Sequence, residues 1–152
     1  AEQADGVLAD VGLELLHKAG TLAKKMDSEV SAVLLGHAVA GLADTLFAHG
    51  ADKVYLLDDP ELQDFRSLPY ANLITRLVEE KRPRVVLFGA THIGRDIAPR
   101  VASHTRSGLT ADCTDLKIET LTIRKVEHPD LLLQIRPAFG GNIIATIISP
   151  DV

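Results

Sequence analysis

The stretch VVLFGATHIGRDIAPR, residues 85–100, carries the strongest indication of the fold. An apolar run ends at Gly89, a loop of small and polar residues follows, and a basic helix is expected from Ile93 onward. This order is typical of the strand–loop–helix unit that binds phosphate groups in α/β proteins. Two interpretations are open at this point: a nucleotide-binding loop, or a turn that keeps the same shape for another purpose.

Elsewhere in the first 108 residues, helical and strand patterns alternate. We expect helices over 10–26, 39–49, 69–81 and 93–104, and buried strands over 30–35, 53–59 and 84–89. Alternation of this kind predicts βαβ units, and continuous apolar runs are typical of parallel strands that are covered on both faces. The expected fold class is therefore α/β, a three-layer α/β/α arrangement around a mainly parallel sheet.

The ends of the chain and its last third depart from this alternation. We expect strands over 110–118, 121–126, 131–136 and 142–149, with a turn at 128–130, which together form a strand-rich extension. The run IIATII, 143–148, is apolar on both faces and is expected to lie deep. Because a parallel α/β domain usually opens with a strand, the opening AEQADGVLAD leads us to expect that a first strand precedes Ala1.

Size and composition narrow the function classes. The chain has 152 residues, which fits one domain, and its net charge of −5 argues against a nucleic-acid partner. It contains no apolar stretch of the length that spans a membrane. The single Cys113 allows no internal disulfide and fits a reducing compartment, so a cytoplasmic location is expected.

The loop after the predicted strand 84–89 contains the first candidate binding residues: Gly89, Thr91, Gly94 and Arg95. Small residues let backbone N–H groups approach an anion, and a guanidinium can bind phosphate in a forked geometry. The loop lacks the Lys-Ser/Thr pair of a P-loop and the third glycine of a dinucleotide fingerprint. Taken alone, the loop is better explained as a plain chain turn.

A second candidate is IRPAFGGN, residues 135–142, where Pro137 and the pair Gly140-Gly141 interrupt a strand. A guanidinium such as that of Arg136 beside a flat, electron-accepting ring would stabilise added negative charge. The alternative is an exposed arginine at a strand end.

The remaining reactive residue types show no catalytic pattern. The histidines lack metal-ligand spacing, and no nucleophile elbow occurs. Cys113 lies between Asp112 and Asp115, and nearby carboxylates disfavour a thiolate. We therefore expect no enzyme activity and no metal site in this chain.

Three sequence blocks carry a family resemblance: GATHIGRDIAPRVA (89–102), SGLTADCTDL (107–116) and RPAFGGNI (136–143). Together they resemble the N-terminal domain of the electron transfer flavoprotein alpha subunit, and the last two are similar to its anaerobic, bifurcating branch. The resemblance covers almost the whole chain, 1–152, and implies a nucleotide alpha-hydrolase-like fold.

The resemblance also implies a cofactor and partners. It implies a heterodimer with a beta subunit, and an FAD that carries electrons from an acyl-CoA or similar dehydrogenase to a respiratory or ferredoxin-linked acceptor. The main FAD-binding domain of the alpha subunit is expected to lie outside these 152 residues, and Gly89, Thr91, Gly94 and Arg95 would then form an inherited, vestigial phosphate-type loop. A second set is expected near the beta-subunit flavin: Arg136, Phe139, Gly140, Gly141 and Asn142.

Three functions remain open on these grounds. The first is an electron-carrier domain that serves as scaffold and beta-subunit-binding surface. The second is a free-standing AMP- or ATP-binding module, and the third is a pure interaction domain without ligand contact.

Overall fold

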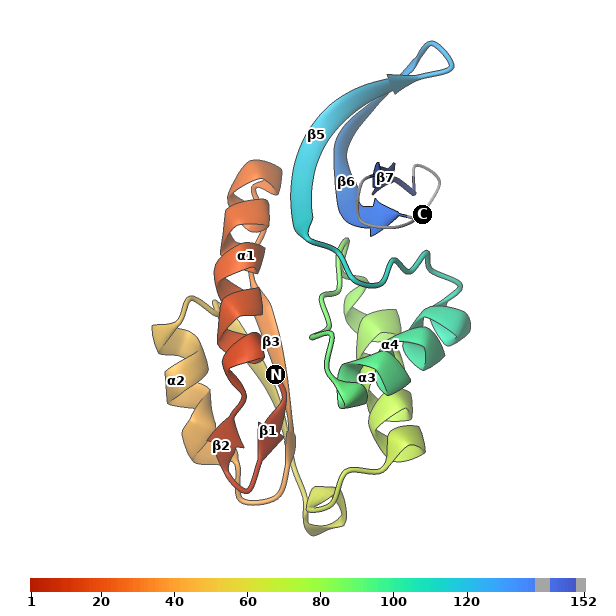
Figure 1. Ribbon diagram of the computed structural model, residues 1–152. Helices are drawn as coiled ribbons and strands as arrows, with labels where there is room; N and C mark the ends of the chain where they lie inside the picture. Colours follow the sequence, from red (N-terminus) through yellow and green to blue (C-terminus); the bar gives the residue numbers. More distant parts are fainter. Residues whose placement is uncertain (139–142, 150–152) are drawn as a thin grey trace.

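The computed structural model describes residues 1–138 and 143–149 (Figure 1). In chain order its elements are β1 (Gln3–Ala4), β2 (Val7–Leu8), α1 (Asp10–Met26), β3 (Ser31–Gly36), the 3-10 turn η1 (Ala40–Leu42), α2 (Ala43–Ala48), β4 (Lys53–Asp58), the 3-10 turn η2 (Pro60–Leu62), α3 (Ser67–Lys81), α4 (His92–Thr105), β5 (Asp115–Ile123), β6 (Val126–Ala138) and β7 (Ile143–Ile147).

The body of the molecule is built around the parallel pair β3 and β4, which align from Ser31 opposite Lys53 to Gly36 opposite Asp58. Successive strand residues point to opposite faces, so Leu34 packs with α1 and α2 while Leu35 packs with α3 and α4. Helices therefore cover both faces of the pair, on the left and right of Figure 1. The expected α/β class is confirmed, with two paired parallel strands among the described residues.

The predicted helices are present with small shifts at their ends. Helix α1 has the expected bounds, α4 buries Ile97 and Val101 as its apolar stripe predicts, and Gly50 ends the second helical segment with a φ of +102°. Helix α3 begins at Ser67, two residues before Pro69. Proline has no backbone N–H, and a backbone N–H in the first turn of a helix has no partner within the helix. Pro69 therefore costs no hydrogen bond at any position of the first turn and need not stand at the first one.

The predicted strand 84–89 is absent: residues 85–89 belong to no sheet. They form one side of a cavity whose other side is β3, so no described strand lies close enough to pair with them. The run is apolar, as expected of a buried strand. A strand also needs a neighbouring strand that completes its backbone hydrogen bonds.

The last third of the chain forms an antiparallel sheet in the order β5-β6-β7, which projects from the body at the top of Figure 1. We call it the arm. The prediction of a turn at 128–130 is wrong, because β5 and β6 are joined by a two-residue turn at Arg124-Lys125 and 128–130 lies within β6. Pro129 and Asp130 together oppose Thr120 alone, so these turn-favouring residues form a β-bulge instead.

Candidate functional site

The loop from Gly89 to Arg95 has the helix-start geometry that the sequence suggests, but no strand precedes it. Thr91 is the N-cap of α4, and its Oγ1 accepts a hydrogen bond from the N–H of Gly94 at 3.0 Å. Gly94 lies so close to the preceding turn that a Cβ on it would be 1.9 Å from the carbonyl oxygen of Gly89. The glycine at position 94 is therefore explained by packing of the helix start against the loop.

An acidic side chain of the same protein lies at the start of α4. The Thr91 hydroxyl donates to Oε2 of Glu2 at 2.6 Å, so this carboxylate approaches the helix end where partial positive charge gathers. A helix N-terminus attracts anions, and Glu2 supplies one from within the chain.

Arg95 also binds groups of its own chain. Its Nε donates to the carbonyl of Ala90 at 3.2 Å, and its two terminal nitrogens contact the carboxylate of Asp112. The side chain is exposed, and the forked geometry expected for phosphate is used on a carboxylate.

A second anion-binding position follows β3 and was missed by sequence reasoning. The N–H groups of Ala38, Val39 and Ala40 donate to the carboxylate of Asp58 at 2.7, 2.9 and 3.1 Å. Consecutive N–H groups of this kind form a nest that binds anions in many proteins. The signal in the sequence was the acidic pair at the end of the run KVYLLDD, since parallel strands β3 and β4 end at the same edge.

The surroundings of Asp58 favour its ionised form. Desolvation is the largest single influence and opposes ionisation, but the three N–H donors and the nearby His37 together hold the pKa of this carboxyl below its ordinary value. The carboxylate is therefore the stable occupant of the nest.

These two positions do not fit a pyrophosphate or the phosphates of FAD as they stand. The donors that would face a phosphate are already bonded within the chain. The Thr91 hydroxyl donates to Glu2, and the N–H groups of 38–40 donate to Asp58. We therefore derive no chemistry of a bound cofactor at either loop.

Of the second candidate set, Phe139, Gly140, Gly141 and Asn142 lie outside the described residues. Arg136 is half-buried in β6, opposite Ala145 of β7, and close enough to Cys113 to affect its titration. Burial raises the pKa of the Cys113 thiol, Arg136 partly opposes this, and Asp112 adds to it. The thiol is therefore held in its less reactive, protonated form, as the flanking carboxylates suggested.

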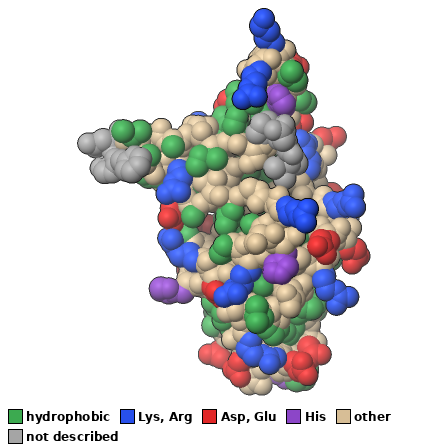
Figure 2. Space-filling view, turned by 90° about the vertical axis from the view of Figure 1, so that its right-hand side faces the viewer, with side chains coloured by type: hydrophobic (Ala, Val, Ile, Leu, Met, Phe, Trp, Pro, Cys, Tyr) green, Lys and Arg blue, Asp and Glu red, His purple; other side chains and the backbone are tan. Residues whose placement is uncertain are grey.

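Strand β7 differs from its expected place in the core. Ile143 and Ile144 are 58% and 70% exposed, and Ile147 is exposed as well, because β7 lies at the edge of the arm and no described element covers it. The expectation of a deep strand is wrong for this structure. Figure 2 shows the arm standing out at the top of the molecule, with apolar side chains on the surface and basic ones at the tip.

Two further features of the described residues concern metal ions and membranes. No three His, Cys, Asp or Glu side chains within 1–138 and 143–149 gather in a way that would hold a metal ion. None of the described helices has the length and apolar character needed to cross a membrane.

An α/β body with helices on both faces of its parallel strands, a helix-start loop and an added antiparallel arm define the class: an α/β domain with a separate antiparallel sheet. The family model described as "Electron transfer flavoprotein domain" matches residues 1–152. The chain belongs to this family, which confirms the resemblance seen in the blocks GATHIGRDIAPRVA, SGLTADCTDL and RPAFGGNI.

Similar proteins are alpha subunits or subunits of related complexes. The chain is 49% identical over 151 residues to the electron transfer flavoprotein subunit alpha of Thermoanaerobacterium thermosaccharolyticum and 47% identical to that of Megasphaera elsdenii, in both cases over 99% of this chain and 43% of the relative. It is 44% identical to the lactate dehydrogenase (NAD(+),ferredoxin) subunit LctC of Acetobacterium woodii, over 97% of this chain and 33% of the relative. The chain thus spans less than half the length of these relatives.

Proposed function

We propose that this chain is the scaffold and partner-binding part of an electron transfer flavoprotein alpha subunit, with no catalytic centre of its own. The observation that carries the proposal is the presence of an internal carboxylate at both anion-binding positions. A nucleotide phosphate would have to displace Asp58 from the N–H groups of 38–40, or Glu2 from Thr91. Such a domain keeps the architecture of a nucleotide-binding domain, but its anion-binding positions hold its own carboxylates, which stabilise the fold. Gly89, Thr91, Gly94 and Arg95 then remain as a vestigial phosphate-type loop.

FAD is held mainly by parts of the complex other than these residues, namely a further alpha domain and the beta subunit. When bound, FAD accepts and donates electrons one or two at a time. Support comes from the names of the relatives, which are electron transfer subunits, and from the finding that the chain covers 43% of the Thermoanaerobacterium thermosaccharolyticum and Megasphaera elsdenii subunits. The larger three-layer parallel sheet expected from the sequence belongs to the same proposal.

The arm is the surface that binds the beta subunit. Its edge strand β7 exposes Ile143, Ile144 and Ile147, and an apolar edge strand also presents unpaired backbone groups. Exposed apolar patches next to a free edge are covered by another chain or another domain in most proteins that keep them.

The electron donor and acceptor follow from the family. We propose an acyl-CoA or similar dehydrogenase as donor and a respiratory or ferredoxin-linked acceptor. The name of the Acetobacterium woodii relative, which includes both NAD(+) and ferredoxin, supports the bifurcating branch. A cytoplasmic location is part of the proposal and is supported by the single Cys113, which allows no internal disulfide.

Arg136 is the residue of this chain that we assign to the neighbourhood of the beta-subunit flavin, together with the 139–142 segment. A guanidinium stays charged at all physiological pH values and favours an anionic, reduced ring over a neutral, oxidised one. In the complete heterodimer, Arg136→Ala should therefore lower the reduction potential of that flavin, and Arg136→Lys should lower it less. An unchanged potential in both variants would remove Arg136 from electron transfer.

Binding measurements on the isolated chain test the main proposal. Calorimetric titration with AMP, ATP and FAD should give no saturable binding, whereas the beta subunit should form a one-to-one complex with it. Saturable binding of AMP or ATP would favour the free-standing nucleotide-binding module that uses the loop at 89–95. Failure to bind the beta subunit would contradict the scaffold function directly.

A further inference from the structure

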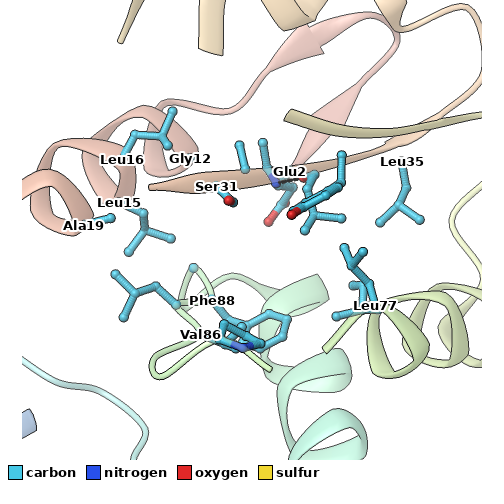
Figure 3. Close-up of a pocket in the computed structure, with 18 of the residues that line it drawn as sticks. Glu2, Gly12, Leu15, Leu16, Ala19, Ser31, Leu35, Leu77, Val86 and Phe88 are labelled. Carbon is cyan, nitrogen blue, oxygen red and sulfur yellow. Dashed lines mark hydrogen bonds between the residues drawn. The ribbon is translucent and has the colours of Figure 1, made fainter. Parts of the chain in front are cut away.

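The arm takes no part in the apolar interior of the body. The two apolar cores of the body lie on either side of the β3–β4 pair, and no described residue that follows Val101 belongs to either of them. Figure 3 shows Leu15 of α1 above a cavity inside the body, with Val86 and Phe88 below it, and no described residue of the arm lines this cavity. Between α1 and β5 lies a smaller gap of about 180 Å³. Neither core therefore fixes the position of the arm on the body.

The chain enters the arm through a segment that Arg95 holds to the body. Residues 106–114, which we call the linker, follow α4 and belong to no helix or strand. The two terminal nitrogens of Arg95 donate to the carboxylate of Asp112 in this linker, at 2.5 and 3.4 Å. Asp112 has a φ of +58°, in the left-handed region that aspartate adopts more readily than most residues. The residue type at 112 therefore fits both the backbone conformation and the ion pair.

Two further aspartates join the arm itself to the body. Nζ of Lys18, on α1, donates to Oδ1 of Asp115, the first residue of β5, at 2.8 Å. Nη1 of Arg84, which follows α3, lies 3.6 Å from Oδ2 of Asp130, and its Nη2 donates to the backbone carbonyl of the same residue at 3.3 Å. Asp130 belongs to the β-bulge of β6, and a bulge changes the direction in which a side chain points. The bulge thus accounts for an aspartate that reaches the body from within a strand.

All three described ion pairs that join the body to the linker or the arm have the same arrangement of charge, with the cation on the body and the aspartate on the other side. We call these pairs the clamp: Lys18–Asp115, Arg84–Asp130 and Arg95–Asp112. The cations come from α1 on one face of the β3–β4 pair, and from α4 and the segment after α3 on the other face. The arm is thus held from both helical layers of the body.

The exposure of the clamp decides what it can do. Its side chains are 35–55% exposed, so dissolved salt screens the charges. Exposed ion pairs contribute little to the free energy of unfolding. One orientation of the arm, however, competes only with other orientations of the same folded arm, so a small contribution is enough to select it.

We propose that Lys18, Arg84 and Arg95 are positioning residues: through the clamp they hold the folded arm in one orientation on the body, and the arm turns about the linker when the clamp is broken. The arm keeps its own structure in either case, because the backbone hydrogen bonds of β5, β6 and β7 lie within its sheet. The orientation of the arm does not depend on the proposed electron-transfer function, whereas its consequence for the beta subunit rests on that function.

The distance between two spin labels tests the clamp. In a Cys113→Ser background, labels are attached to cysteines that replace Asn72 of α3 and Thr122 of β5, both exposed, and pulsed electron paramagnetic resonance gives the distribution of distances. With the clamp intact, the distribution at low salt should be narrow. Replacing all three aspartates of the clamp by asparagine removes the charges and should widen it about twofold. About 1 M NaCl should widen the distribution of the intact clamp in the same way, because it screens exposed charges beyond about 3 Å.

A charge reversal and a matched control separate the clamp from a general loosening of the fold. Lys18→Asp should widen the distribution, and Lys18→Asp combined with Asp115→Lys should narrow it again. Asp96→Asn is the control, because Asp96 pairs with Arg100 within α4 at a similar exposure, and its distribution should stay narrow. An unchanged width in the triple variant, or equal widening in the control, would overturn the clamp. If the triple variant did not fold, the salt titration would decide, and a width independent of salt would overturn the clamp.

Binding of the beta subunit tests the consequence of the clamp for association. A partner that binds a freely turning arm has to order it, so the affinity should fall about fivefold in the triple variant and stay unchanged in Asp96→Asn. Equal affinities despite a widened distribution would show that the beta subunit does not read the orientation of the arm. No binding even with the clamp intact would contradict the proposed function, while the distance measurement would still decide whether the clamp orients the arm.

Discussion

Thr91 and Glu2 are 89 positions apart in the chain and meet at the first turn of α4, where one hydroxyl serves both as donor and as acceptor. It donates to the Glu2 carboxylate at 2.6 Å and accepts from the N–H of Gly94 at 3.0 Å. The beginning of the chain is thereby fixed to the loop that the sequence suggested for phosphate.

Replacing Thr91 tests this double role. Thr91→Ala removes both hydrogen bonds and should lower the free energy of unfolding by about 1 kcal/mol, the usual effect of losing an N-cap. Thr91→Ser keeps the hydroxyl and should remain within about 0.5 kcal/mol of the natural chain. Urea unfolding followed by circular dichroism measures both. If the alanine variant were as stable as the serine variant, the cap would contribute nothing.

Two helix glycines, Gly94 in α4 and Gly20 in α1, predict opposite effects of alanine. A Cβ at Gly94 would meet the carbonyl oxygen of Gly89 at 1.9 Å, so Gly94→Ala should destabilise the protein by about 1–3 kcal/mol. A Cβ at Gly20 in α1 meets nothing within 4 Å, so Gly20→Ala should stabilise it by about 1 kcal/mol through helix propensity. Thermal unfolding of the two variants in one buffer makes the comparison, and the same sign for both would contradict it.

The nest around Asp58 predicts a pH dependence of stability. Because its folded-state pKa lies below the ordinary value of 3.8, the carboxylate stabilises the fold fully above that value, and this contribution is lost as the pH falls through the folded-state pKa. Asp58→Asn should therefore be less stable than the natural chain at pH 7, and the gap should close in acid. Glu14→Gln, at an exposed position of α1 with no ion pair among the described residues, provides the control. A gap that stayed constant down to pH 2 would show that the charge of Asp58 is not responsible.

The exposed edge strand predicts a separation between stability and association. Ile144→Thr keeps a β-branched side chain on β7 and removes apolar surface, so unfolding should change by less than about 0.5 kcal/mol. Binding to the beta subunit should weaken about tenfold, which corresponds to about 1.4 kcal/mol. Val7→Thr, on the β1–β2 hairpin away from the arm, should leave the affinity unchanged. Equal losses in both variants would place the interface elsewhere.

Local patterns in the sequence predicted the helices well. The bounds of α1 and the buried stripe of Ile97 and Val101 follow from side-chain spacing, and the positive φ of Gly50 follows from residue type. Each of these depends on neighbours within one or two turns.

Features set by distant parts of the chain were not predictable in the same way. The run 84–89 has strand character but no partner among the described strands, and 143–148 has core character but no described element that covers it, since both features depend on contacts with residues far away in the sequence. Likewise, no linear pattern indicates that Glu2 would reach Thr91, and the acidic pair that ends KVYLLDD indicates Asp58 only once β3 and β4 are known to end at the same edge. Pro129 and Asp130 are typical turn residues. They form a β-bulge because the pairing of β6 with β5 continues on both sides of them.

The outer end of the arm has a consequence for how the molecule meets other charged surfaces. Arg124 and Lys125 both have positive φ values, 50° and 70°. Two-residue hairpin turns with positive φ favour asparagine and glycine at these positions. Each residue bears a backbone penalty of about 1–2 kcal/mol that its long side chain does nothing to relieve. A chain with an overall negative charge thus carries two cations side by side at the outer turn of the arm, and such a local positive charge is attracted to acidic surfaces.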